Sequence, residues 1–177
     1  MPDFKGRIIR AAKLDVSLYE EVEADKEAMG QAMGVVVLSS IAAGIGAISE
    51  GGIGGILTVT ISALIGWYVW AYITYFIGTR LLPEPQTKAD YKELLRTIGF
   101  SSSPGLIRIL GIVPGLTGIV FFVASIWMLI AMVIAVRQAL DYSGTGRAVL
   151  VCIIGWIIQA IILAILFAIL RGSTAAV

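Results

Sequence analysis

Four long apolar runs alternate with shorter polar segments along the chain, and each run predicts a membrane-spanning helix. A helix rises about 1.5 Å per residue, so about 20 apolar residues are needed to cross the hydrocarbon core of a bilayer. The runs that reach this length cover residues 28–48, 53–79, 116–136 and 148–170. The predicted fold class is therefore all-α, a polytopic membrane helix bundle.

The segment between the second and third runs has a different pattern. In residues 88–98 apolar residues recur at helical spacing between charged ones, which predicts an amphipathic helix at the membrane interface. The chain breaks at residues 99–104 and continues as a short apolar run over residues 105–113. If residues 99–116 cross as an α-helix, they cover only roughly 26 Å, so neighbouring helices must shield this third span or the bilayer must thin.

Within the first 27 residues, a basic segment is followed by an acidic one. Residues 4–13 carry basic residues beside an apolar face, which predicts a helix on an anionic membrane surface, with a solvated tail as the alternative. The next residues are acidic and form either a solvated helix or a docking surface for a cytosolic partner; they are Glu20, Glu21, Glu23, Asp25 and Glu27. The expected lipid-surface contacts of the two amphipathic segments are Lys5, Arg7, Arg10, Lys13, Lys92 and Arg96.

Two features inside the spans predict how they pack. Gly30 and Gly34 lie four residues apart, a spacing that lets helix backbones approach closely. The glycine pairs of GGIGG, residues 51–55, predict the turn between the first two spans. The second half of that second span is aromatic, which predicts an interfacial belt with packing contacts, while a ligand-stacking wall is the minority alternative; these residues are Trp67, Tyr68, Trp70, Tyr72, Tyr75 and Phe76.

Composition supports the membrane class and argues against several chemistries. Hydrophobic residues make up 58% of the chain and charged residues 14%, well below the share of about a quarter that is usual in soluble domains. The net charge of +1 gives no reason to expect a nucleic-acid partner. The sequence has no histidine and a single cysteine, Cys152, so we expect no metal centre, haem or other cofactor, and we expect Cys152 to be a small buried residue.

The charges of the loops predict a topology. If the short run crosses, the N-terminal segment, the 80–98 loop and the 137–147 loop share one side, which collects the basic residues outside the spans except Arg171. The positive-inside rule then predicts five spans with the N-terminus cytoplasmic and the C-terminus outside; four spans are the alternative. The opening residues lack the apolar core and cleavage site of a signal peptide, so we expect the N-terminal segment to be retained.

Arg108 is the one charged residue that this prediction places well inside a span. It lies roughly 13 Å along the helix from Gly99, where a lone guanidinium costs at least ~2.5 kcal/mol. Arginine cannot release its proton, so a polar partner is expected, and the sequence offers Glu50 and Gln159. The alternative is that Arg108 reaches the outer headgroups, helped by the shortness of this span.

Three stretches of the chain resemble the Yip family of five-span membrane proteins, in a bacterial form. They are FKGRIIRAAKLDVSLYEEVEADKEAMGQA, YKELLRTIGFSSSPGLIRILG and IWMLIAMVIAVRQALDYSGTGRAVLVCIIGW. In that family a glycine–aromatic pair followed by a proline opens the third span, which corresponds to Gly99, Phe100 and Pro104. The resemblance implies a cytoplasmic lead, residues 1–27, and a Yip-like transmembrane domain, residues 28–177.

The resemblance also implies association with other membrane proteins, and in eukaryotic members a role in vesicle trafficking with small prenylated GTPases. Those members have a longer cytosolic N-terminal region, so the resemblance does not extend to a GTPase partner for this chain. We expect an integral protein of the bacterial inner membrane, with lipids, other membrane proteins or further copies as partners.

Two classes of function follow. The first is a non-enzymatic scaffold or accessory subunit that acts through helix packing and its cytoplasmic amphipathic segments, in membrane organisation or trafficking. The alternative is a transporter or channel for a small solute or lipid, with a polar path near Arg108. An enzyme is not expected, because the spans carry no paired carboxylates, histidines or serine-based constellation.

Overall fold

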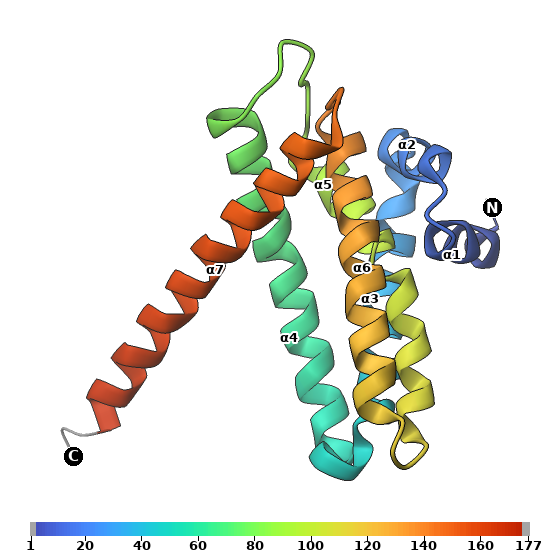
Figure 1. The fold of residues 1–177 in the computed structure, drawn as a ribbon, viewed down its shortest axis with the longest axis vertical. Helices are drawn as coiled ribbons and strands as arrows, with labels where there is room; N and C mark the ends of the chain where they lie inside the picture. Colours follow the sequence, from blue (N-terminus) through green and yellow to red (C-terminus); the bar gives the residue numbers. More distant parts are fainter. Residues whose placement is uncertain (1–2, 175–177) are drawn as a thin grey trace.

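The fold is all-helical, as the apolar runs predicted. The structure is a computed structural model that describes residues 3–174, without the side chains of residues 49–51, 163 and 166–174. Within this part the chain forms helices and loops but no β-strand (Figure 1). The elements are α1 (Phe4–Ala12), α2 (Val16–Ala24), η1 (Lys26–Ala28), α3 (Met29–Gly46), α4 (Ile48–Phe76), η2 (Ile77–Leu81), α5 (Tyr91–Phe100), η3 (Ser103–Ile112), α6 (Thr117–Ala139) and α7 (Thr145–Thr174).

Four helices are long and apolar enough to cross a membrane, among the residues described. The candidate spans are Lys26–Gly46, Gly52–Leu81, Thr117–Ala139 and Thr145–Ile162. In Figure 1, α3 runs down to the turn with α4, α4 runs back up, η3 descends beside α6, and α7 descends after α6. The chain therefore changes direction after each of these segments.

The short segment between α5 and α6 differs in geometry from the expected α-helix. Residues Ser103–Ile112 form a 3₁₀-helix, which rises about 2.0 Å per residue and so covers about 20 Å over its ten residues. An α-helix of that length would cover about 15 Å. The tighter winding lets a short apolar run reach the same end of the molecule as the turn between α3 and α4 (Figure 1).

The turn between the first two spans is shorter than the GGIGG pattern suggested. α3 ends at Gly46, and helical structure resumes at Ile48 with a kink at Gly52, where φ is +61° and ψ is −173°. Residues with a side chain are strongly disfavoured in this region of backbone space. Gly54 and Gly55 already belong to the helix that follows, so a single glycine conformation redirects the chain.

The amphipathic segment 88–98 forms a helix, as predicted, and that helix is largely covered by other parts of the protein. α5 begins with a capping box between Asp90 and Glu93 and then contacts α2, α3, α4 and α6. From Leu94 to Phe100 every residue of α5 is buried. α2 also packs against α5, where it accepts a hydrogen bond from Arg96, so α5 does not lie free on a surface. Its place at the membrane interface stays a prediction.

Backbone contacts between helices occur at glycines other than the predicted pair. A Cβ on Gly30 would meet nothing within 4 Å, and one on Gly34 would meet only the ring of Phe4. In contrast, a Cβ on Gly99 would lie 2.8 Å from the Cβ of Ala32, and one on Gly46 would overlap the carbonyl oxygen of Arg108. The close approaches therefore join α3 to α5 and to η3.

Candidate functional site

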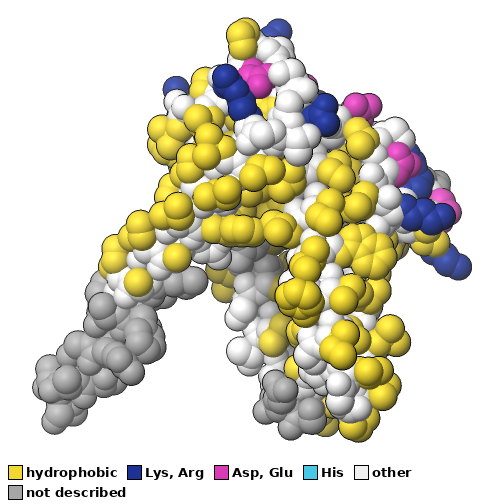
Figure 2. Space-filling model, viewed as in Figure 1, with side chains coloured by type: hydrophobic (Ala, Val, Ile, Leu, Met, Phe, Trp, Pro, Cys, Tyr) yellow, Lys and Arg dark blue, Asp and Glu magenta, His cyan; other side chains and the backbone are white. Residues whose placement is uncertain are grey.

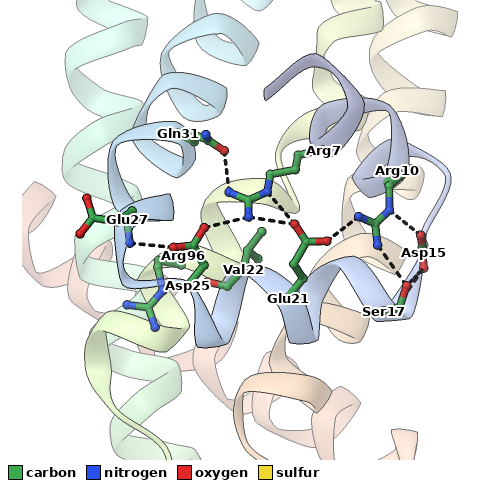
Figure 3. Close-up of polar contacts among 10 residues, drawn as sticks. All are labelled: Arg7, Arg10, Asp15, Ser17, Glu21, Val22, Asp25, Glu27, Gln31 and Arg96. Carbon is green, nitrogen blue, oxygen red and sulfur yellow. Dashed lines mark hydrogen bonds and ion pairs between the residues drawn. The ribbon is translucent and has the colours of Figure 1, made fainter. Parts of the chain in front are cut away.

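The charged lead folds back on itself around Arg7 (Figure 3). Only 5% of the Arg7 side chain is exposed, and its guanidinium donates to Glu21 Oε1 at 2.8 Å, to Asp25 Oδ2 at 2.8 Å and to Gln31 Oε1 at 2.9 Å. These partners lie on α2, on the turn after it and on α3. The basic residue that was expected at the lipid surface instead ties the lead to the first span.

A second arginine extends this network along α1. Arg10 donates to Asp15 Oδ2 at 2.8 Å and to Glu21 Oε2 at 2.5 Å. The charge-assisted bond from Arg10 lowers the pKa of Asp15 to about 2, and the bonds from Arg10 and Arg7 lower the pKa values of Glu21 and Asp25, respectively. These carboxylates are therefore ionised at neutral pH and bound to arginines.

Other contacts attach the lead to the bundle. Arg96 of α5 is buried and donates from Nε to the carbonyl oxygen of Val22 at 2.8 Å and from Nη2 to that of Glu23. It thereby satisfies carbonyls at the C-terminal end of α2, where a cation is also favoured by the helix dipole. Trp127 of α6 donates from Nε1 to the Ala12 carbonyl at 2.8 Å.

The six residues expected at the lipid surface therefore separate into two groups. Arg7 and Arg96 are buried within the protein, and Arg10 is ion-paired. The remaining three, Lys5, Lys13 and Lys92, are exposed. Lipid contact stays a prediction for these lysines.

A recess with several carboxylates lies beside the lead. Its cavity of about 520 Å³ is lined by Glu20 and Glu23 of α2, Glu93 of α5, and Arg137 and Asp141 at the end of α6. Desolvation raises the pKa of Glu23 to about 7, and the negative charges of Asp141, Glu93 and Glu20 add to this shift while Arg96 opposes it. Folding therefore favours the protonated form of Glu23.

We expect Glu23→Gln to stabilise the protein at pH 8 and to stabilise it much less at pH 5. A raised folded-state pKa means that the contribution of Glu23 is fully favourable below its ordinary pKa of 4.5 and is lost as pH rises through about 7. Thermal unfolding in detergent at the two pH values measures the effect. Glu27→Gln, which makes the same charge change at an exposed position outside the recess, is the control. An equal gain at pH 5 and pH 8 would show that charge at Glu23 is not the cause.

A second cavity lies between the spans, about midway along them. It has a volume of about 320 Å³, and its walls come from α3, α4, α5, η3, α6 and α7. The polar or aromatic lining residues are Ser39, Ser40, Trp67, Trp70, Ser102, Arg108, Trp156 and Gln159. We call this cavity the Arg108 pocket.

The Arg108 pocket contains donors whose hydrogen-bonding needs are unmet by the described residues. Nε of Arg108 and Nε1 of Trp70 are both buried without a partner in this part of the chain. The guanidinium carbon of Arg108 lies 5.5 Å from the centre of the Phe121 ring, in a cation–π contact. Trp67, in contrast, donates from Nε1 to the Leu95 carbonyl at 3.0 Å.

The predicted polar site is thus partly assembled. Gln159 lines the same pocket as Arg108, although the described side chains form no hydrogen bond between the two. The side chain of Glu50, the other expected partner, lies outside the described residues. Sequence reasoning missed Trp70 as a member of the site; its signal was the aromatic run of the second span, interpreted mainly as an interfacial belt.

A comparison with known protein families shows to which family the chain belongs. A sequence profile of the Yip1 domain matches residues 21–167. The chain belongs to the Yip1 domain family. No curated protein and no solved structure matches the chain.

The residues that carried the resemblance to the Yip1 family have structural roles here. Gly99 allows α5 to contact Ala32 of α3 closely, Phe100 is fully buried, and Pro104 lies in the first turn of η3, where its missing N–H is tolerated. Together these residues fix where η3 leaves α5. The Yip1 motif therefore determines the position of Arg108, five residues from the start of η3. Cys152 is buried, as its apolar surroundings predicted.

Proposed function

We propose that the protein is a non-enzymatic integral membrane protein that binds part of a lipid in the Arg108 pocket. The observation that carries the proposal is a mainly apolar cavity midway along the spans, with the unmet donors of Arg108 and Trp70 in its lining. Such donors are costly in a hydrocarbon environment, and membrane proteins retain them where they contact a ligand, water or each other.

The arrangement of the last helix supports access from the bilayer. In Figure 1, α7 diverges from α4 and α6 along its length. Large apolar side chains are exposed on α4 and α7 on either side of this divergence; they are Ile53, Leu57, Ile61, Ile157, Ile161 and Ile165. Acyl chains can cover such residues without an energetic penalty, so a lipid can approach the pocket sideways.

A scaffold or accessory subunit is the second candidate function. Its expected cytoplasmic contact surfaces are largely used within the chain, because the lead pairs with itself and α5 is buried. Helix packing remains available to it. A groove between α6 and α7 has an entirely apolar lining near Val133, Val149 and Ile153, where a helix of another membrane protein could pack.

Two assays separate these candidates. Reconstitution into liposomes with a fluorescent phospholipid tests whether the protein moves lipid between leaflets or vesicles, and the lipid-binding proposal predicts exchange above that of protein-free vesicles. Purification from the native membrane tests the scaffold, which predicts other membrane proteins in fixed stoichiometry. Exchange at the protein-free rate together with stoichiometric partners would favour the scaffold.

We further propose that the protein lies in a bacterial inner membrane with five crossings, its N-terminus cytoplasmic and its C-terminus outside. Charged residues gather at the end of the molecule that carries the lead and the loop after η2, while the described side chains on the visible face of the opposite end include no Lys, Arg, Asp or Glu (Figure 2). Contacts such as Thr87 to the Leu140 carbonyl at 2.9 Å and Arg147 to Glu84 at 3.2 Å hold the basic loops at one end. This distribution is the one that the positive-inside rule predicts.

We expect a reporter inserted at Gln86 to be cytoplasmic and one fused after Val177 to be outside. Val177 itself lies beyond the described residues. Paired alkaline phosphatase and fluorescent-protein fusions measure both positions, and a fusion in the turn at Gly115 provides a second outside position. Reporters at Gln86 and Val177 on the same side would contradict five crossings.

A further inference from the structure

We propose that the Arg108 pocket recognises the phosphate group of a glycerophospholipid, with Arg108 and Trp70 as its donors. This inference rests on the proposed lipid-binding function and assigns the chemistry that it recognises. The pocket presents donors in excess, so the complementary group is an acceptor, and the fixed positive charge of Arg108 selects an anionic one. Phosphate is the anion that a guanidinium matches best, through parallel hydrogen bonds.

The guanidinium of Arg108 is positioned to bind an anionic ligand. Its carbonyl contacts Gly46 of α3, which fixes the backbone, and its guanidinium lies beside Phe121, which limits the side chain to one direction. Four other carboxylates, those of Glu20, Glu23, Glu93 and Asp141, line the separate recess at the charged end of the molecule. Among the described side chains, the carboxylates that form ion pairs are bound to Arg7, Arg10 and Arg147, so none of these neutralises Arg108.

Trp70 supplies an independent second observation. It is 5% exposed, it lines the pocket, and its indole N–H lacks a partner among the described residues. A buried unpaired donor destabilises the folded protein, so it points to an acceptor that completes the site. Its ring also packs near Trp156 of α7, at 6.3 Å between centroids, which makes Trp70 a link between the pocket and the diverging helix.

The rest of the lining favours a lipid as the source of the phosphate. Apolar side chains make up much of the wall; they include Val36, Ala43, Val59, Ala63, Met128 and Met132. A free phosphate ion would lose its hydration at this depth and gain no apolar contact. A phospholipid brings the same anionic group together with acyl chains that match both the wall and the exposed face of α7.

The test uses the full chain in detergent and measures its thermal unfolding with four additives. Phosphatidylglycerol and phosphatidylcholine share the phosphate, diacylglycerol has the same acyl chains without it, and inorganic phosphate has the anion without the chains. We expect both phospholipids to raise the unfolding temperature and the other two additives to leave it unchanged. Arg108→Gln should lower the apparent phospholipid affinity by at least about 10-fold, the effect of losing one charge-assisted hydrogen bond.

Two variants keep the test decisive if Arg108→Gln folds poorly. Trp70→Phe keeps an aromatic ring in place and removes only the donor, and we expect a weaker phospholipid shift with little change in the stability of the lipid-free protein. Arg80→Gln makes the same charge change at an exposed residue outside the pocket and should leave the shift intact.

Each other outcome overturns the headgroup assignment in a different way. Equal stabilisation by diacylglycerol would show that only the acyl chains are bound, which rejects phosphate recognition but retains lipid binding. Stabilisation by inorganic phosphate would show that the ligand is a free anion. An unchanged shift in both Arg108→Gln and Trp70→Phe would place the lipid elsewhere, and no shift with any additive would mean that water satisfies the pocket.

Discussion

Gly46→Ala is expected to destabilise the protein by about 1–3 kcal/mol or more, as overpacking of a close backbone contact does. A Cβ on Gly46 would overlap the carbonyl oxygen of Arg108 and lie 3.0 Å from its carbonyl carbon and from Cε2 of Phe121. Two of these three atoms belong to backbone, so no rotation of a side chain can relieve the clash. The α3 and η3 backbones would have to separate, which would also displace Arg108 from its pocket.

Thermal unfolding in detergent measures this effect, and α3 offers its own control. Gly30→Ala makes the same change in the same helix, where a Cβ would meet nothing within 4 Å. Because glycine costs roughly 0.5–1 kcal/mol more than alanine inside a helix, Gly30→Ala should stabilise the protein slightly. If Gly46→Ala were as stable as Gly30→Ala, the close contact between α3 and η3 would not exist in solution.

The apolar runs predicted the long helices well because a membrane span needs a long apolar stretch, which composition alone reveals. The expected span 116–136 corresponds to Thr117–Ala139, and the expected end of the second span at Thr79 lies within two residues of the end of η2 at Leu81. The Yip1 motif around Gly99 was also recognisable from its residues. These features are local, so the sequence is sufficient to locate them.

Features that depend on contacts between residues far apart in the sequence were predicted less well. The small-residue spacing of Gly30 and Gly34 suggested helix contact, but the spacing does not identify which helix faces it. The 3₁₀ winding of η3 cannot be read from periodicity in a run of ten residues. The Arg108 pocket brings together Ser39, Trp70 and Gln159, and their sequence separations give no sign that they converge.

The lead shows the same limit for charges. Residues 4–13 were interpreted as facing lipid, and the acidic residues after them as solvated or facing a partner. A basic face followed by an acidic segment can equally pair internally, and a turn at Leu14, with φ of +62°, brings α2 back along α1. Both segments form helices, α1 and α2. What their charged side chains contact depends on how the two helices lie relative to each other.

Arg7→Gln is therefore expected to release the lead from the bundle, at a cost of about 1.5–3 kcal/mol for the loss of hydrogen bonds to charged groups. The substitution removes the shared partner of Glu21 and Asp25, whose side chains are 38% and 24% exposed, so water can compensate only in part. Hydrogen exchange of the amides in α1 and α2 measures the release. We expect faster exchange there and little change in α4 and α6, because the hydrogen bonds of Arg7 go to Glu21, Asp25 and Gln31.

Acidification should imitate Arg7→Gln if the ion pairs hold the lead. The pKa values of Glu21 and Asp25 are lowered from 4.5 and 3.8, so their contribution is present above these values and is lost as pH falls through the lowered ones. Lys5→Gln, at an exposed residue of the same helix, should leave exchange in α2 unchanged at neutral pH. If the amides of α1 and α2 exchange in Arg7→Gln at the rate of the parent protein, the ion pairs are not what holds the lead to the bundle. The burial of Tyr19 and the hydrogen bond from Trp127 to the Ala12 carbonyl would then be sufficient.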